Sequence, residues 1–234
     1  IVINVDGLLI APVSIANIDE AMNHYDVRSI YTERAGRSLA RSFDKRVLRT
    51  LVLAARTTTP TITGGPAGET ITKATLETDA GALKEAIAEA AEAMDSKNVP
   101  TDERYVVLRP KAYYTLLKDR EILNRDYGQA GSLATATLPE WMNFKLLKSN
   151  NMPTGTVSAV SGERNNYAGD FTNTVGVAFQ KCAVGTVKLL DLAVEAEYSV
   201  RHQATLIVAK YAMGHGCLYP EAAVELAKSA GGGS

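Results

Sequence analysis

Residues 207–219 read IVAKYAMGHGCLY, a run of apolar and aromatic positions that leads into Gly214, His215 and Gly216. Two interpretations fit this stretch. A strand could run into an active-site loop with His215 as a base or a ligand. Alternatively, a strand could turn a tight corner and carry no chemistry at all. The rest of the sequence decides between them.

The residues around this stretch predict a long antiparallel pair of strands. Segment 203–213 alternates between apolar and polar positions, as a half-buried strand does. Segments 183–193 and 195–200 continue a strand pattern, and the residues at 201–202 would connect the two strands. Segment 220–227 would then add either a last strand or a short helix.

Segment 18–55 carries the pattern of one very long helix. Apolar residues recur at spacings of three and four, and no proline interrupts residues 13–59. A continuous helix of this length would span roughly 57 Å, whereas helices in globular proteins usually have about 10–14 residues. The middle of the segment is sparse in apolar residues, which predicts that the helix lies across a surface and contacts several neighbours.

The charges on this predicted helix are ordered, with acidic residues early and basic residues late, as the helix dipole favours. Glu33 and Arg37 are spaced for an i,i+4 ion pair worth about 0.2–0.5 kcal/mol. A solvated face and ion pairs between subunits both fit these charges. A nucleic-acid patch fits less well, because no aromatic residues are interleaved with the basic ones. The candidate subunit contacts are Asp19, Arg28, Glu33, Arg37 and Arg41.

The remaining segments complete an α+β pattern. Residues 1–10 alternate as a strand that has no earlier partner, and another subunit could supply one. A Thr/Gly/Pro-rich loop is expected at 56–72. The middle of the chain then predicts a helix from about 76 to Pro100, a strand at 104–108, a short helix from Pro110, strands at 143–148 and 175–179, and loops at 124–139 and 149–173.

Bulk composition excludes several classes of protein. The 25 basic and 26 acidic residues give a net charge of −1, which argues against a dedicated nucleic-acid binder. No apolar run approaches the roughly 18 residues of a membrane span.

Cys182 and Cys217 fit buried thiols better than a disulfide framework. The chain opens in mid-pattern, so we expect an N-terminal part before Ile1, and we expect residues 231–234 (GGGS) to form a flexible tail.

The sequence contains no recognisable catalytic, metal or cofactor motif. Its three histidines, His24, His202 and His215, lack the neighbours that a zinc site requires. A Cys–His nucleophilic pair is conceivable, with Cys182 or Cys217 as nucleophile, but no third group orients it. The sequence therefore predicts no enzyme and no cofactor, and it favours a structural or binding role.

Three stretches together carry a family resemblance: EAMNHYDVRS (20–29), VGTVKLLDLAVE (184–195) and IVAKYAMGHGCLYPEAA (207–223). In this order they resemble the major capsid proteins of T-seven-like short-tailed phages, over about the whole of 1–228. The resemblance implies the HK-ninety-seven-like capsid fold, in which a peripheral domain holds a long spine helix and a β-ribbon and an axial domain lies at the centre of each ring.

The resemblance also implies a division of the chain. Residues 1–11 would be the return strand of an extended loop, 12–74 the peripheral domain with its spine helix, 75–183 the axial domain, 184–217 the peripheral β-ribbon, 218–230 a return to the axial domain, and 231–234 the tail. Gly214 and Gly216 would give the backbone freedom for a corner. His215 would then be a packing or hydrogen-bonding residue.

The function implied is a self-assembling coat of the icosahedral head of a tailed double-stranded DNA phage. The partners implied are further copies in hexamers and pentamers, scaffolding protein and portal during assembly, and packaged DNA enclosed without sequence-specific binding. No membrane partner is expected. The location implied is the virion, after assembly in the host cytoplasm. An encapsulin-type shell that encloses protein cargo is the alternative with the same fold.

Overall fold

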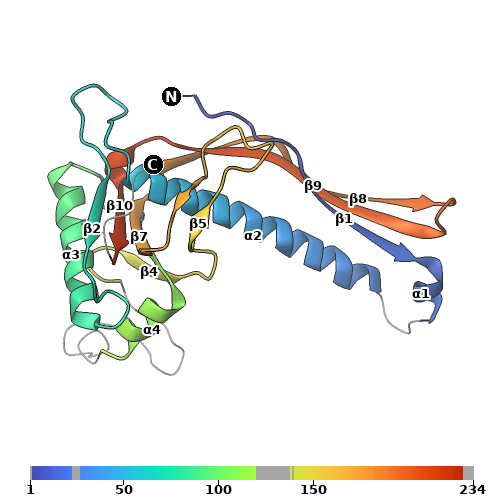
Figure 1. The fold of residues 1–234 in the computed structure, drawn as a ribbon, viewed down its shortest axis with the longest axis horizontal. Helices are drawn as coiled ribbons and strands as arrows, with labels where there is room; N and C mark the ends of the chain where they lie inside the picture. The colour runs from blue at the N-terminus through green and yellow to red at the C-terminus, as the bar shows by residue number, and fades with distance from the viewer. Residues whose placement is uncertain (1, 23–26, 120–137, 139, 229–234) are drawn as a thin grey trace.

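The computed structural model describes residues 2–22, 27–119, 138 and 140–228. A long helix, α2 (Val27–Ala55), joins a ribbon of long strands to a mixed sheet that is packed against two further helices (Figure 1). The molecule is elongated, because the ribbon and the first half of α2 project together from the compact end. The predicted α+β class and the end of the long helix at Ala55 are both confirmed.

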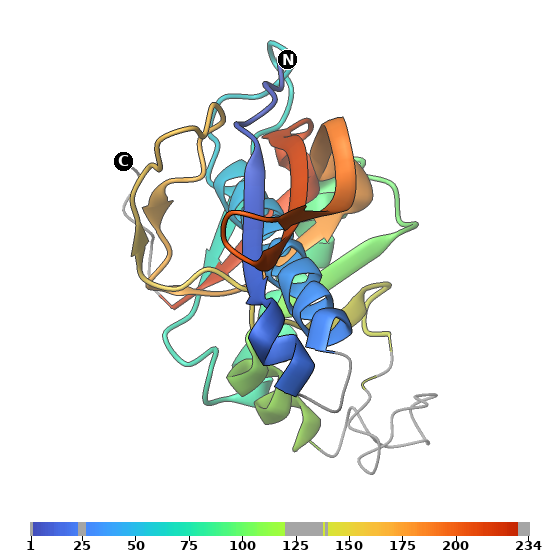
Figure 2. The same cartoon turned by 90° about the vertical axis from the view of Figure 1, so that its right-hand side faces the viewer.

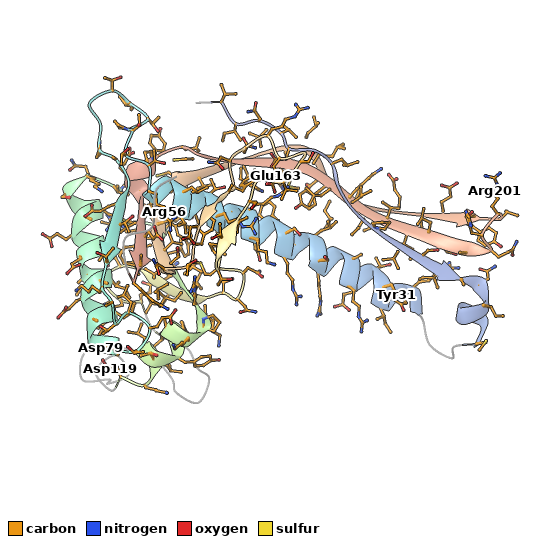
Figure 3. The ribbon with its side chains drawn as sticks, in the orientation of Figure 1. Tyr31, Arg56, Asp79, Asp119, Glu163 and Arg201 are labelled. Carbon is orange, nitrogen blue, oxygen red and sulfur yellow. The ribbon has the colours of Figure 1, made fainter. Side chains whose placement is uncertain are left out.

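The ribbon is a three-stranded antiparallel sheet in the order β1-β9-β8. Its strands are β1 (Leu9–Ala16), β8 (Val184–Ser199) and β9 (Ala204–Cys217). The predicted pairing of the last two strands is confirmed, with Val184 opposite Cys217 and Ser199 opposite Ala204. Arg201 lies at the connection, at the tip of the ribbon (Figure 3).

The predicted strand at 1–10 is wrong in its position. The strand begins at Leu9, continues through Pro12 and pairs along its whole length with β9 of the same chain. Proline is tolerated because β1 is an edge strand, where a missing N–H breaks no ladder hydrogen bond. The short helix α1 (Asn17–Met22) follows directly, within one residue of the predicted start of the helical segment at 18.

The two glycines near the end of β9 make room for another segment and do not form a corner. Both lie inside the strand, and neither has a positive φ. A Cβ atom on Gly214 would lie 1.9 Å from the carbonyl oxygen of Asn4, and one on Gly216 would lie 2.7 Å from a side-chain carbon of Ile3. The predicted corner is therefore wrong, because the glycines let residues 3–4 cross the ribbon closely.

Replacing Gly214 by alanine is expected to displace the N-terminal segment and to lower the free energy of unfolding by about 1–3 kcal/mol, as overpacking does. Gly36→Ala is the matched control, because nothing lies within 4 Å of a Cβ atom there and the residue is inside α2. That control should stabilise the protein by about 0.5–1 kcal/mol. Urea unfolding and limited proteolysis of the first eight residues measure both effects. Equal effects of the two substitutions would contradict this packing.

The compact end is built on a five-stranded mixed sheet in the order β2-β10-β7-β3-β4. Its strands are β2 (Glu69–Thr72), β3 (Arg104–Leu108), β4 (Lys145–Lys148), β7 (Thr174–Gln180) and β10 (Ala223–Ala227). The sheet lies between α3 (Ala80–Ser96) and the C-terminal turns of α2 (Figure 1). Burial on both faces explains why its central strands read as continuous apolar runs.

The predictions for this end are mostly confirmed. The strand at 104–108, the strand around 175–179 and the helix that starts with proline, α4 (Pro110–Leu117), all form. Segment 220–227 forms both alternatives, a 3₁₀ turn (Pro220–Ala222) and then β10. The expected loop at 56–72 is wrong in its last four residues, which form β2. Short strands β5 (Thr156–Val157) and β6 (Gly169–Asp170) interrupt the loop at 149–173, and most of the loop expected at 124–139 lies outside the described residues.

Helix α2 contributes to two separate hydrophobic cores. Ala35 and Leu39 pack with Tyr211 and Met213 under the ribbon. Leu51 and Val52 pack in the large core of the compact end. Leu39 and Val52 are 13 residues apart, which places them about 220° apart around the helix. The buried face therefore changes sides along α2, and this explains the sparse middle of its apolar pattern.

A buried ion pair fixes the end of α2 to the middle of the sheet. The Glu225 carboxylate on β10 is fully buried and accepts from Arg56 Nε at 2.6 Å, from Arg56 Nη2 at 2.8 Å and from the Thr174 hydroxyl at 2.6 Å. Arg56 also donates to the Asp170 carbonyl at 2.6 Å (Figure 3). The hydrogen bond to Glu225 is the main cause that raises the pKa of Arg56.

Candidate functional site

Strand β8 is exposed along almost its whole length. It forms one edge of the ribbon, so one row of its backbone groups has no partner strand among the described residues. It carries several large exposed apolar side chains: Val187, Leu189, Leu190, Leu192, Val194 and Tyr198. Leu189 is 70% exposed. A long apolar edge strand is a site where another chain pairs or packs. This edge is therefore the leading candidate for self-association.

The exposure of β8 follows from the position of α2. The helix lies along the ribbon beside β9 and β1 (Figure 2). It covers Ala209 and Tyr211, which are both buried. The width of one helix, about 10 Å, covers about two strands at 4.8 Å spacing, and the third strand is left uncovered.

The five predicted contact residues do not form one cluster. Arg28 donates from Nη2 to the Thr205 hydroxyl at 3.3 Å within the same chain. Glu33 and Arg37 form the predicted i,i+4 ion pair at 2.5 Å, and both are largely exposed. Arg41 is exposed on the next turn. Asp19 lies in α1, and its side chain is outside the described part of the structure.

His215 is a buried packing residue, as predicted. Only 1% of the residue is exposed, and its Nδ1 lies 2.9 Å from the Thr186 hydroxyl on β8. Its ring meets the edge of Phe43 on α2, with the ring centroids 4.7 Å apart. Burial lowers the pKa of His215 to about 4. The imidazole therefore stays neutral at pH 7 and holds α2, β8 and β9 together.

The two thiols lack the surroundings of a nucleophile. Burial raises the pKa of Cys217 to about 11 and also raises the pKa of Cys182. Reactive cysteines need a lowered pKa and an electropositive environment. Among the described residues, no group of three or more histidine, cysteine, aspartate or glutamate side chains is placed to hold a metal ion. No described helix is both long and apolar enough to cross a bilayer.

Acidification should destabilise the subunit through His215. The unfolded histidine has a pKa of about 6.5 and the folded one about 4, so the unfolded state binds a proton that the folded state does not. Stability is therefore expected to be unaffected above pH 6.5 and to fall as the pH drops from about 6.5 towards 4. The urea midpoint measured between pH 7.5 and 5 checks this. A His215→Asn variant should have a shallower slope, and an unchanged slope would contradict the assignment.

A polar cluster that sequence reasoning missed ties the N-terminal segment to the ribbon. The buried Asp6 carboxylate accepts from the Tyr167 hydroxyl at 2.5 Å and from the backbone N–H of Arg164 at 2.9 Å. Tyr167 in turn accepts from the N–H of His215 at 3.0 Å, and burial is the first cause that raises its pKa to about 12. The loop at 149–173, which stood out only by its length, thus folds over residues 2–8.

The same cluster reaches α2. Arg46 Nη2 lies 3.0 Å from the Glu163 carboxylate, and Arg46 Nη1 lies 3.8 Å from Asp6 (Figure 3 labels Glu163). The helix, the loop and the N-terminal segment therefore meet over the base of the ribbon. This arrangement fixes the direction in which the ribbon leaves the compact end.

The comparisons with known proteins agree with this architecture. A family model described as Gp10A-like, major capsid protein, matches residues 1–227. The chain belongs to this family of major capsid proteins. The major capsid protein of Escherichia phage T7 is 36% identical over 247 residues, which cover 95% of this chain and 71% of that protein. The major capsid protein of Enterobacteria phage T3 is also 36% identical, over 248 residues.

Solved capsids share the fold of this capsid chain. The capsid of cyanophage P-SCSP1u matches with a TM-score of 0.88 and 38% identity, over 96% of this chain and 73% of that one. The mature capsid of bacteriophage PhiM1 matches with a TM-score of 0.79 at 19% identity, over 97% of this chain and 72% of that one. The predicted HK-ninety-seven-like capsid fold is confirmed. The family function is that of the major capsid protein of tailed phages, which assembles into a multimeric shell.

The alternative of a cargo-enclosing compartment is not favoured by these relatives. A virus-like particle from Pyrococcus furiosus shares the fold with a TM-score of 0.58, at 16% identity. The curated relatives at 36% identity are all phage capsid proteins. The phage interpretation of the sequence is therefore supported over the encapsulin-type interpretation.

Proposed function

We propose that this chain closes into hexamers and pentamers that tile the icosahedral head of a tailed phage. The peripheral part would comprise 12–74 and 184–217, and the axial part would comprise 75–183 and 218–230. Rings of identical subunits need heterologous contacts between different surfaces of one chain. The shell would enclose double-stranded DNA without sequence-specific binding and would assemble in the host cytoplasm with scaffolding protein and portal. The subunit would have a structural role in the shell and would catalyse no reaction.

One observation carries this proposal, the apolar and unpaired edge of β8 on a ribbon that projects from the compact end. A subunit that worked alone would expose this edge to water and risk aggregation. In a shell, the same edge is buried against a neighbour. Many such contacts stabilise the whole particle even where each contact is weak.

The charged residues on and near the first half of α2 are proposed to set the register between neighbours. These are Asp19, Arg28, Glu33 and Arg37, with Arg41 one turn further on. Charged pairs at an interface select orientation and partner more than they add affinity. The exposed Glu33–Arg37 pair adds little to the stability of the subunit, so it is available for such a role.

Charge reversal at Arg37 tests this role. Arg37→Glu places two like charges next to each other and is expected to reduce the yield of closed particles. The free energy of unfolding should change by no more than about 0.5 kcal/mol, because the site is exposed. Sucrose-gradient sedimentation of assembled material and urea unfolding of dissociated subunits measure the two quantities. Normal particles from this variant would remove Arg37 from the contacts between subunits.

Electron microscopy of the full-length protein tests the proposed function itself. The protein would be expressed alone and together with a scaffolding partner, and the products would be imaged by negative staining. Uniform closed shells in either sample are the expected result. A monodisperse monomer in both samples would overturn the proposal and would leave only the fold in common with capsid proteins.

A further inference from the structure

Helix α2 presents a stripe of cations on the face that points away from the ribbon. Arg34, Arg41 and Lys45 are all exposed. At about 100° per residue they fall within roughly 40° of one another, on the side of the helix opposite the buried Leu39. None of the three makes a salt bridge within the described part of the chain. We call these three residues the α2 stripe.

The molecule is electrically polarised around this stripe. Helix α2 carries seven basic and two acidic residues, a net charge of +5. Strand β8 carries one basic and three acidic residues, a net charge of −2. The chain as a whole has a net charge of only −1. The positive charge is therefore concentrated on one element of a nearly neutral protein.

A shell has an inner surface that meets a polyanion and an outer surface that meets solvent. We propose that the α2 stripe faces inwards and contacts the phosphate backbone of the enclosed double-stranded DNA, an inference that rests on the proposed function. Two of the three cations are arginines, whose planar guanidinium groups bind phosphate oxygens with two hydrogen bonds. Neighbouring stripe residues are about 6–10 Å apart along the helix axis, so each can reach a separate phosphate.

This contact is weak, independent of sequence and sensitive to salt. Three cations per subunit release few counterions, and such binding weakens steeply as salt is added. The stripe also lacks interleaved aromatic residues that would stack on bases, so it does not read the bases. Arg41 is the residue shared by the stripe and the proposed contacts between subunits, and it would lie where the two surfaces meet.

Lysine labelling of assembled particles tests the inference. Purified particles filled with DNA, and the same particles emptied of DNA and treated with nuclease, would be modified briefly with a small amine reagent and analysed by mass spectrometry. Lys45 is expected to react at least about fivefold more slowly in the filled particles at low salt, and this protection should disappear at high salt. Lys181, whose side chain is 69% exposed, is the internal control and should react equally in both.

Each other outcome overturns the inference in a recognisable way. Equal reactivity of Lys45 in filled and emptied particles would show that the stripe does not touch DNA. Protection in both would place a neighbouring subunit over the stripe. Protection only in DNA-free precursors that contain an internal protein would identify an acidic protein as the partner. If the protein forms no particles at all, the proposed function itself is contradicted. If particles form but Lys45 is not protected by DNA, only the present inference is contradicted.

A neutralised stripe provides a second readout. The variant Arg34→Gln, Arg41→Gln, Lys45→Gln should still form closed particles, but its filled particles should show a smaller salt dependence of DNA release on heating. The matched control is Lys145→Gln, Lys181→Gln, Lys111→Gln, which removes three exposed positive charges elsewhere on the chain and leaves β8 unchanged. Identical salt dependence in the two triple variants would overturn the inference.

Discussion

Replacing Glu225 by alanine is expected to lower the free energy of unfolding by about 3–5 kcal/mol, the usual cost of leaving one partner of a buried ion pair alone. Arg56 would keep its charge in a site where its side chain is only 12% exposed. In a chain of this size, the loss corresponds to a decrease of roughly 6–20 °C in the Tm of the dissociated subunit. Thermal and urea unfolding of the full chain measure it.

Two further variants make this prediction specific. Lys181→Met breaks the exposed Lys181–Glu103 pair and should cost at most about 1 kcal/mol. The double variant Arg56→Met, Glu225→Leu removes both charges and should recover most of the lost stability, because apolar replacements of a buried pair are often tolerated. If Glu225→Ala cost no more than Lys181→Met, the pair would not fix α2 to the sheet.

The second large effect is expected on assembly and not on folding. The double variant Leu189→Glu, Leu192→Glu places two carboxylates on the exposed edge of β8. Burial of a leucine side chain contributes about 1.5–3 kcal/mol, so losing two in each contact weakens association by more than about 100-fold. Closed particles should therefore disappear, while the dissociated subunit unfolds within about 0.5 kcal/mol of the unaltered protein.

The matched control keeps the apolar character of the edge. Leu189→Met, Leu192→Met conserves volume and hydrophobicity and should assemble normally. Sedimentation and electron microscopy of all three proteins at equal concentration give the comparison. Particles of normal yield from the glutamate variant would remove β8 from the interfaces between subunits.

Local patterns predicted those elements whose neighbours lie close in the sequence. Strands β8 and β9 are joined by a short turn. Apolar and polar residues alternate along β9 because α2 covers only one face of that strand. The helix that begins at Pro110 follows from proline at its first turn. Strand β1 was misplaced because residues 1–5 also alternate and because proline usually interrupts a strand, whereas the edge of a sheet tolerates Pro12.

Long-range contacts could not be predicted from the sequence. Asp6 and Tyr167 are 161 residues apart, and Arg56 and Glu225 are 169 apart, so no local spacing relates either pair. The roles of Gly214 and Gly216 depend on residues 3–4, more than 200 positions earlier. The apolar residues of β8 were visible in the sequence, but an apolar strand usually indicates burial. Only the limited width of α2 leaves this strand exposed.

The most direct test is a high-resolution electron cryomicroscopy reconstruction of particles assembled from the full-length protein. If the exposed edge of β8 is an interface between subunits, a neighbouring subunit buries the side chains of Leu189 and Leu192 in this reconstruction. A closed shell in which β8 faces solvent along its whole length would contradict this role of β8.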